Sequence, residues 1–259
     1  MLTVQNVYDF INERAPFETQ LAFDNSGLLL GNPAAVVTGI HFALDVNHAV
    51  IDEAIACGAN LIVTHHPLMF SAIKRLVETS YEPALICRMI RAGISLIAAH
   101  TNLDQDPGGV NDTLAAVIGL GDVTGEGFLR VGDLPRPMSA AALAEHISRR
   151  LGDVVRVMGD ADAIITRVGL CSGSGSDEWP AAAALGAQAF LTGEVKHHHA
   201  LEASANGVVL LEAGHHATEL PGIFALADAL QTSEDIVQCN LRVTKSSAHA
   251  YPTTVRLCT

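Results

Sequence analysis

One strand-like segment occurs twice in this chain, and this repetition limits the possible folds more than any other feature. Residues 58–64 read Gly-Ala-Asn-Leu-Ile-Val-Thr, and residues 186–192, which lie 128 positions later, read Gly-Ala-Gln-Ala-Phe-Leu-Thr. A second pair follows in the same order, because residues 92–97 (Ala-Gly-Ile-Ser-Leu-Ile) match residues 206–211 (Asn-Gly-Val-Val-Leu-Leu). Two matches in one order indicate a duplicated structural unit.

Short apolar segments alternate with helical patterns of about ten residues in both halves, which is typical of βαβ units with parallel strands. Glycines and prolines cluster at 119–137 and are expected to join the halves. We therefore predict an α/β fold made of a duplicated α/β unit, with two similar three-layer domains and a metal site in the cleft between them. The first half is expected to cover residues 1–125 and the second half residues 126–259.

The expected strand at 61–64 runs directly into His65, His66 and Pro67. Neighbouring side chains on a strand point to opposite faces, so two adjacent histidines share one site only where the strand has ended. Pro67 keeps His66 out of the helical conformation. Open α/β sheets place their ligands at the carboxyl ends of strands, so this corner is the first candidate site.

The same kind of tail follows the next strand in each half. His100 is followed by Asp104 in the first half, and His215 by Glu219 in the second. Imidazole and carboxylate together suit Zn²⁺, Fe²⁺, Mn²⁺ or Ni²⁺ better than a metal that prefers oxygen ligands alone. Several such ligands exceed the need of one ion and suit two divalent metal ions about 3.5–4 Å apart, with a bridging carboxylate.

Several roles stay open at this stage. His100 is expected either to orient a metal ligand or to carry protons, and only one of His215 and His216 is expected to reach a metal. The run His197–His199 is expected to open a helix or to face the substrate, with metal ligation as the less favoured alternative. The loop 172–176, Ser-Gly-Ser-Gly-Ser, is either an anion-binding turn or a plain turn.

Charge and composition exclude other classes of function. The formal net charge of −13 disfavours binding to a nucleic-acid backbone. Five cysteines without Cys-x-x-Cys spacing indicate reduced thiols, and with no visible signal peptide or apolar span we expect a cytoplasmic protein that does not contact membranes.

Four segments resemble the Nif-three-like family, whose members are often described as GTP cyclohydrolase 1 type 2 homologs. These segments are 60–70 (Asn-Leu-Ile-Val-Thr-His-His-Pro-Leu-Met-Phe), 98–104 (Ala-Ala-His-Thr-Asn-Leu-Asp), 191–198 (Leu-Thr-Gly-Glu-Val-Lys-His-His) and 212–219 (Glu-Ala-Gly-His-His-Ala-Thr-Glu). Phe23-Asp24-Asn25 is similar to the family's Trp-Asp-Asn. The resemblance extends from Phe17 to about Leu241, whereas the tail after Val243 departs from the family pattern.

The resemblance implies that His66 and Asp104 hold one metal ion, that His65 and His215 hold the other, and that Glu219 bridges them. It also implies dimers that assemble into a toroidal hexamer. The implied activity is that of a dinuclear metal-dependent hydrolase acting on a purine nucleotide through a metal-bound hydroxide, as a GTP cyclohydrolase 1 type 2 does. His100 is the expected catalytic proton carrier. The alternatives are a metal-dependent phosphatase or phosphodiesterase, and a non-enzymatic metal-binding scaffold.

Overall fold

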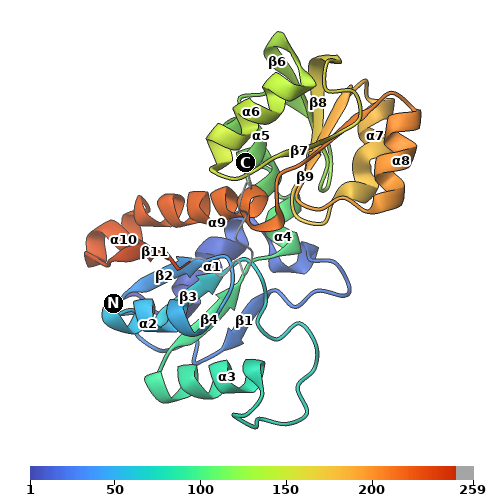
Figure 1. Cartoon of the computed structure of the whole chain (residues 1–259). Coiled ribbons are helices and arrows are strands. Elements are labelled where there is room, and N and C mark those ends of the chain that lie inside the picture. The colour runs from blue at the N-terminus through green and yellow to red at the C-terminus, as the bar shows by residue number, and fades with distance from the viewer. Residues whose placement is uncertain (249–259) are drawn as a thin grey trace. The chain divides into compact units, whose positions relative to one another are not determined.

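The computed structural model describes residues 1–248, which contain two β-sheets and divide into two compact units (Figure 1). Among these residues, the first unit comprises Met1–Asp106 and 223–248, and the second comprises Pro107–Gly222. Each unit is an α/β structure with its own sheet, as the sequence predicted. None of the described helices is long and apolar enough to cross a membrane.

The sheet of the first unit has the order β1-β4-β3-β2-β11. Its strands are β1 (Gly27–Leu30), β2 (Ile40–Ala43), β3 (Leu61–Thr64), β4 (Ser95–Ala98) and β11 (Val243–Lys245). The three central strands β2, β3 and β4 pair in parallel, and β11 adds in parallel beside β2, whereas β1 pairs antiparallel with β4. Parallel pairing brings the carboxyl ends of β2, β3 and β4 to one edge of the sheet, where the candidate site residues begin.

The helices of this unit are α1 (Val4–Arg14), η1 (Phe17–Thr19), α2 (His48–Ala56), α3 (Tyr81–Ala92), α4 (Thr101–Gln105) and α10 (Glu234–Cys239). Helix α1 starts at a capping box in which Thr3 accepts from the backbone of Asn6. Apolar side chains of α2 and α3 pack with Ile62 and Leu96 on one face of the sheet. The neighbouring residues Val63 and Ile97 point to the other face and are also fully buried, so both faces are covered.

The sheet of the second unit has the order β5-β6-β8-β9-β10-β7. Its strands are β5 (Gly121–Thr124), β6 (Arg130–Ser139), β7 (Arg156–Met158), β8 (Ile164–Cys171), β9 (Ala189–Thr192) and β10 (Val209–Glu212). Strands β8, β9 and β10 pair in parallel, and β5, β6 and β7 add antiparallel neighbours at the two sides.

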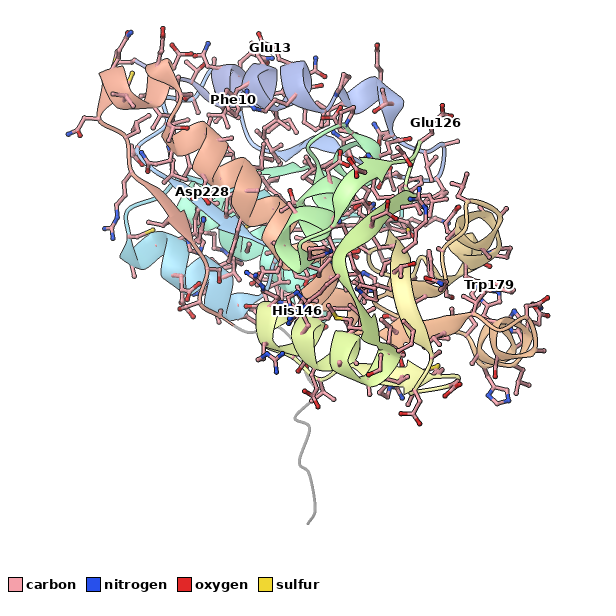
Figure 2. The ribbon with its side chains drawn as sticks, turned by 90° about the horizontal axis from the view of Figure 1, so that it is seen from above. Phe10, Glu13, Glu126, His146, Trp179 and Asp228 are labelled. Atoms are coloured by element: carbon pink, nitrogen blue, oxygen red, sulfur yellow. The ribbon has the colours of Figure 1, made fainter. Side chains whose placement is uncertain are left out.

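The helices of the second unit are α5 (Val110–Ile118), α6 (Ala140–Leu151), η2 (Ser176–Glu178), α7 (Trp179–Ala184) and α8 (His197–Ala205). Leu191 of β9 faces a core formed with α5 and α6, whereas its neighbour Phe190 faces a core formed with α7 and α8. This alternation produces three layers, and Figure 2 shows His146 of α6 and Trp179 of α7 on helices of this unit.

The two sheets repeat the same strand register, which confirms the duplication. Ile40 of β2 pairs with Leu61 of β3, and Val168 of β8 pairs with Ala189 of β9, each 128 positions later. The last residue of both β3 and β9 is a threonine, and in both units its carbonyl accepts a backbone hydrogen bond from the residue after the next strand, Ala99 or Ala213.

Two expectations differ from the structure. The glycine- and proline-rich segment 119–137 is not a linker, because it contributes the antiparallel pair β5 and β6 to the second sheet, with a register shift between Asp133 and Met138 where two prolines interrupt the pairing. The division into compact units also differs from the expected division at residues 125 and 126. Helix α9 (His215–Gln231) begins in the second unit and ends in the first, where β11 completes the sheet beside β2.

Candidate metal centre

His65 and His66 occupy the corner that follows strand β3. The hydroxyl of Thr64, the last strand residue, donates to the carbonyl of His66 at 2.8 Å and so fixes the turn. The side chain of His65 is fully buried, and that of His66 is about one quarter exposed. Both imidazoles therefore stand at the carboxyl edge of the sheet, as predicted from the adjacent proline.

The Nδ1 atom of each of these two rings is held by an acceptor from a neighbouring strand end. Nδ1 of His65 lies 2.8 Å from the carbonyl oxygen of Ala99, and Nδ1 of His66 lies 2.7 Å from Oδ1 of Asp45. A carbonyl or carboxylate oxygen only accepts, so Nδ1 carries the proton in both rings. In the neutral imidazoles the lone pair is then on Nε2, which is the arrangement of a metal ligand.

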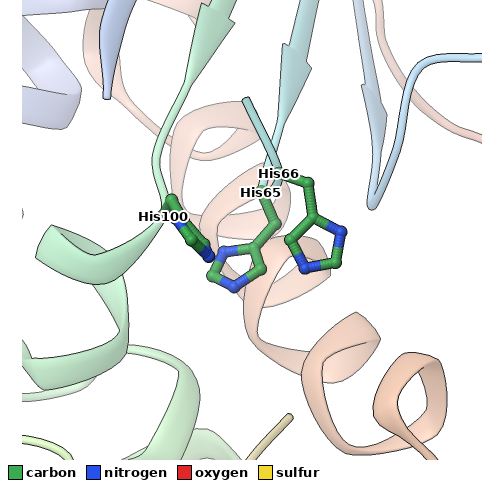
Figure 3. A group of neighbouring side chains, drawn as sticks. All are labelled: His65, His66 and His100. Carbon is green, nitrogen blue, oxygen red and sulfur yellow. The ribbon is translucent and has the colours of Figure 1, made fainter. Parts of the chain in front are cut away.

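His100 follows β4 and brings a third imidazole to the same corner (Figure 3). One ring nitrogen of each of His65, His66 and His100 lies within 4.8 Å of the others. Nδ1 of His100 lies 2.8 Å from Oδ1 of Asp24, and the other carboxylate oxygen, Oδ2, accepts from the backbone N–H and the hydroxyl of Thr101. Burial disfavours the Asp24 carboxylate, but the hydrogen bonds from His100 and Thr101 outweigh it and hold its pKa well below the ordinary value.

Asp104 lies on the short helix α4, one turn after His100. Its side chain is nine-tenths buried, and its Oδ1 lies 3.4 Å from Nε2 of His65. A carboxylate directed at the Nε2 side of a buried imidazole is the donor set expected for a borderline divalent cation. The first unit therefore assembles three imidazoles and one carboxylate from the ends of β3 and β4.

His215 and Glu219 occupy the first turns of α9 in the second unit. They are four residues apart on one helix face, and Nε2 of His215 lies 3.0 Å from Oε2 of Glu219. Nδ1 of His215 lies 3.0 Å from Oε1 of Glu194, which follows β9. The hydrogen bond from Ser174 and the one from His215 lower the pKa of Glu194. Glu194 therefore holds the Nδ1 side of the His215 ring, and the Nε2 side faces Glu219.

Two glycines allow the loops after β8 and β9 to lie close to Glu219 and His215. A Cβ atom on Gly173 would stand 2.1 Å from Oε1 of Glu219, and one on Gly193 would stand 2.7 Å from the Cα of His215. The backbone of Gly173 has a φ of +57°, which glycine adopts without strain. Its N–H donates to the hydroxyl of Thr218, so the loop after β8 is fastened directly to α9.

The other candidates from the sequence, the run His197–His199 and the loop 172–176, make contacts different from those of the histidine corner. The run His197–His199 opens helix α8, as expected; His197 and His198 are exposed, and the buried ring of His199 lies 3.0 Å from the hydroxyl of Ser176. In the serine-glycine loop, the backbone N–H of Ser172 donates to the side chain of Asn111. Because the N–H groups of Ser172 and Gly173 both have protein acceptors, the plain-turn alternative describes this part of the loop.

Asp45 and Glu194 were not among the residues predicted from the sequence, although both hold a candidate ligand. Asp45 stands two residues after β2, and Glu194 stands two residues after β9. Their positions in the sequence could have indicated this role, since each residue follows a parallel strand at the sheet edge where the histidines lie. Glu194 takes the place in the second unit that His66 takes in the first, two residues after the final threonine of its strand.

Comparison with known proteins identifies the family of this chain. The model of the family Duf34/NIF3 (NGG1p interacting factor 3) matches residues 2–252. A Campylobacter jejuni protein named GTP cyclohydrolase 1 type 2 homolog is 33% identical over 219 residues, which cover 84% of this chain and 88% of the relative. A Streptomyces coelicolor protein of the same name is 33% identical over 257 residues, covering 93% and 90%. A crystal structure of a Staphylococcus aureus protein superposes with a TM-score of 0.93 at 28% identity, covering 98% of this chain and 99% of the other.

Proposed function

Because the chain belongs to the Duf34/NIF3 family, we propose that it is a dinuclear metal-dependent hydrolase that acts on a purine nucleotide, as a GTP cyclohydrolase 1 type 2 would. The names of its relatives support the substrate class. The observation that carries the metal part of the proposal is the contact between Nδ1 and an oxygen acceptor in three separate histidines. His65, His66 and His215 each give that atom to a protein acceptor, which leaves Nε2 as the donor.

The proposed ligand set divides between two ions. His66 and Asp104 would hold one ion, His65 and His215 the other, and Glu219 would bridge them. These side chains supply three imidazole nitrogens and two carboxylates, a mixture that fits zinc, iron, manganese or nickel. Asp45, Glu194 and the carbonyl of Ala99 would orient the three imidazoles from outside. Each unit by itself supplies an incomplete set of these ligands.

When bound, two such ions would supply Lewis acidity, which makes a nucleophile available near neutral pH and stabilises the negative charge that develops in hydrolysis. His100 is the proposed proton carrier. Asp24 keeps Nδ1 of His100 protonated, so Nε2 is the atom that would accept a proton from the attacking water and pass it to the ring nitrogen of the purine. Attack of one water at C8 would break the C8–N9 bond and open the imidazole ring of guanine to a formamide, and a second water would hydrolyse that formamide and release C8 as formate.

The test measures metal content and products on the same protein. Elemental analysis of gently purified protein should approach two equivalents of metal per chain, and incubation with GTP should release formate. Release of phosphate without formate would replace this reaction with a phosphatase. A fully occupied site with one ion would contradict the dinuclear centre. His66→Ala should lose metal and turnover, whereas His48→Ala should keep both, because His48 is an exposed residue at the start of α2.

We also propose that the chain acts as a homo-oligomer, with a toroidal hexamer as the expected state, and that its working partner is a small nucleotide rather than a nucleic acid or a membrane. The net charge of −13 supports the exclusion of nucleic acid. Light scattering on the metal-loaded protein would measure the mass of the assembly, and a monomer at micromolar concentration would contradict this proposal.

A further inference from the structure

Two phenylalanine rings next to the histidine corner are exposed to solvent. Phe23 is 61% exposed and Phe70 is 49% exposed, although large aromatic side chains usually supply core contacts. Their ring centroids are 6.1 Å apart with an angle of 50° between the planes, so the two rings do not stack face to face. We call this pair the aromatic ledge.

The aromatic ledge is fixed to the candidate site by short contacts. Phe70 follows the corner of His65 and His66 on the same segment, and its ring meets the ring of His100 edge-on with centroids 6.3 Å apart. Phe23 directly precedes Asp24, whose carboxylate is held by His100 and Thr101. The side chain of Asn25 donates to the carbonyl of Met69 at 2.6 Å and so joins the two loops that carry the rings.

This arrangement calls for a ligand with a flat apolar face and a polar part that reaches the histidines. An exposed aromatic ring offers a stacking surface, and heteroaromatic bases bind such surfaces through their π-faces. Lys74 and Arg75 are exposed on the same loop as Phe70, and they place two adjacent cations there in a chain with 15 basic and 28 acidic residues. A nucleotide carries both complementary parts, a planar base and a polyanionic phosphate chain.

We propose that Phe23 and Phe70 form the base-binding subsite, on which the purine ring of the substrate stacks while its reacting carbon faces the histidines. This inference rests on the proposed function for the identity of the base. The aromatic ledge sets specificity and position rather than chemistry, because its rings hold no proton and no metal. It should therefore contribute to binding of the base and not to binding of metal or of phosphate alone.

The test uses the full, metal-loaded chain and two probes, GTP and inorganic tripolyphosphate, measured by calorimetry. Phe70→Leu should weaken GTP binding by at least about fivefold and leave the affinity for tripolyphosphate and the metal content unchanged. Phe10→Leu is the matched control, since Phe10 lies on α1 (Figure 2) with its ring against the guanidinium of Arg14. That control should change neither affinity.

Phe23→Trp keeps a stacking ring and adds a reporter. Its indole fluorescence should be quenched by GTP and not by tripolyphosphate, while the resident Trp179 is 6% exposed and should contribute a constant background. Equal quenching by both probes, or a wild-type protein that does not prefer GTP to tripolyphosphate, would overturn the subsite. So would a Phe70→Leu variant that binds GTP normally but changes the mass of the assembly, because the ring would then cover a second copy of this chain.

Formate release separates this inference from the reaction on which it rests. Binding that depends on the base, without release of formate, would support the base-binding role of the aromatic ledge and contradict the cyclohydrolase reaction. Formate release with an unchanged KM for GTP in Phe70→Leu would support the cyclohydrolase reaction and contradict the base-binding role of the aromatic ledge.

Discussion

The carboxylate of Glu194 lies 3.0 Å from Nδ1 of His215 and also accepts from Ser174, so one side chain after β9 orients the first residue of α9. His66 is oriented in the same way by Asp45, at 2.7 Å. In each unit an acidic residue from one strand end holds an imidazole from the next. The candidate ligands are therefore aligned before any metal arrives.

Removing that orientation should weaken metal binding without removing a ligand. In Glu194→Ala, Nδ1 of His215 loses its acceptor, the tautomer is no longer fixed, and metal affinity should fall by about 10- to 100-fold. Glu194→Gln keeps an acceptor oxygen and should fall less. Competition with a chromogenic chelator would measure both affinities, and an alanine variant with wild-type affinity would show that Glu194 does not orient His215.

Gly173→Ala should reduce metal content because its Cβ would stand 2.1 Å from Oε1 of Glu219. Gly207→Ala is a matched control, since Gly207 has a φ of +75° and open space around the missing side chain. Both variants should lose about 1 kcal/mol of stability from the left-handed backbone. Only Gly173→Ala should lose metal in elemental analysis, and equal metal content in the two variants would contradict the close packing against Glu219.

Glu219→Gln should lower metal content more than His216→Ala. A bridging carboxylate that becomes neutral loses its attraction for both proposed ions, whereas the neighbouring imidazole is not a proposed ligand. Elemental analysis after dialysis against a weak chelator would compare the two. Equal losses would mean that the bridging role belongs to another residue.

The Asp24 carboxylate should make the metal-free protein less stable in acid. Its pKa is depressed in the folded state, so its contribution is complete above the unfolded value of about 4 and is lost as the pH falls toward the folded value. Asp24→Asn should cost about 2 kcal/mol at neutral pH, from the lost charged hydrogen bonds. The difference in unfolding free energy between the two proteins should shrink as the pH is lowered from 5 to 3. A constant difference would contradict the depressed pKa.

The strand at 61–64 was predictable because its apolar run and the glycine that precedes it are local features of the sequence. The histidine corner was predictable for a similar reason, since Pro67 and the end of the apolar run are adjacent in sequence. The antiparallel strand β6 was not, because Pro135 and Pro137 lie inside it and normally argue against a strand. The pairing of β11 with β2 joins residues about 200 positions apart, so no local feature of the sequence indicates it.

The orienting residues mark another limit of sequence reasoning. The residue types at His65, His215 and Glu219 can be read directly from the sequence. The role of Asp45, in contrast, depends on which strand ends are neighbours in the sheet. That order appears only once β2 is known to pair with β3. The same holds for Glu194, whose partner His215 follows a different strand.

The shared register of β3 and β9 has an evolutionary consequence. A homodimer built from one such unit must carry the same residue at both copies of a position, because symmetry repeats every substitution. Here the second position after the strand is His66 in one copy and Glu194 in the other. Two copies joined in one chain are free of that constraint, so equivalent positions can carry different side chains, as His66 and Glu194 do.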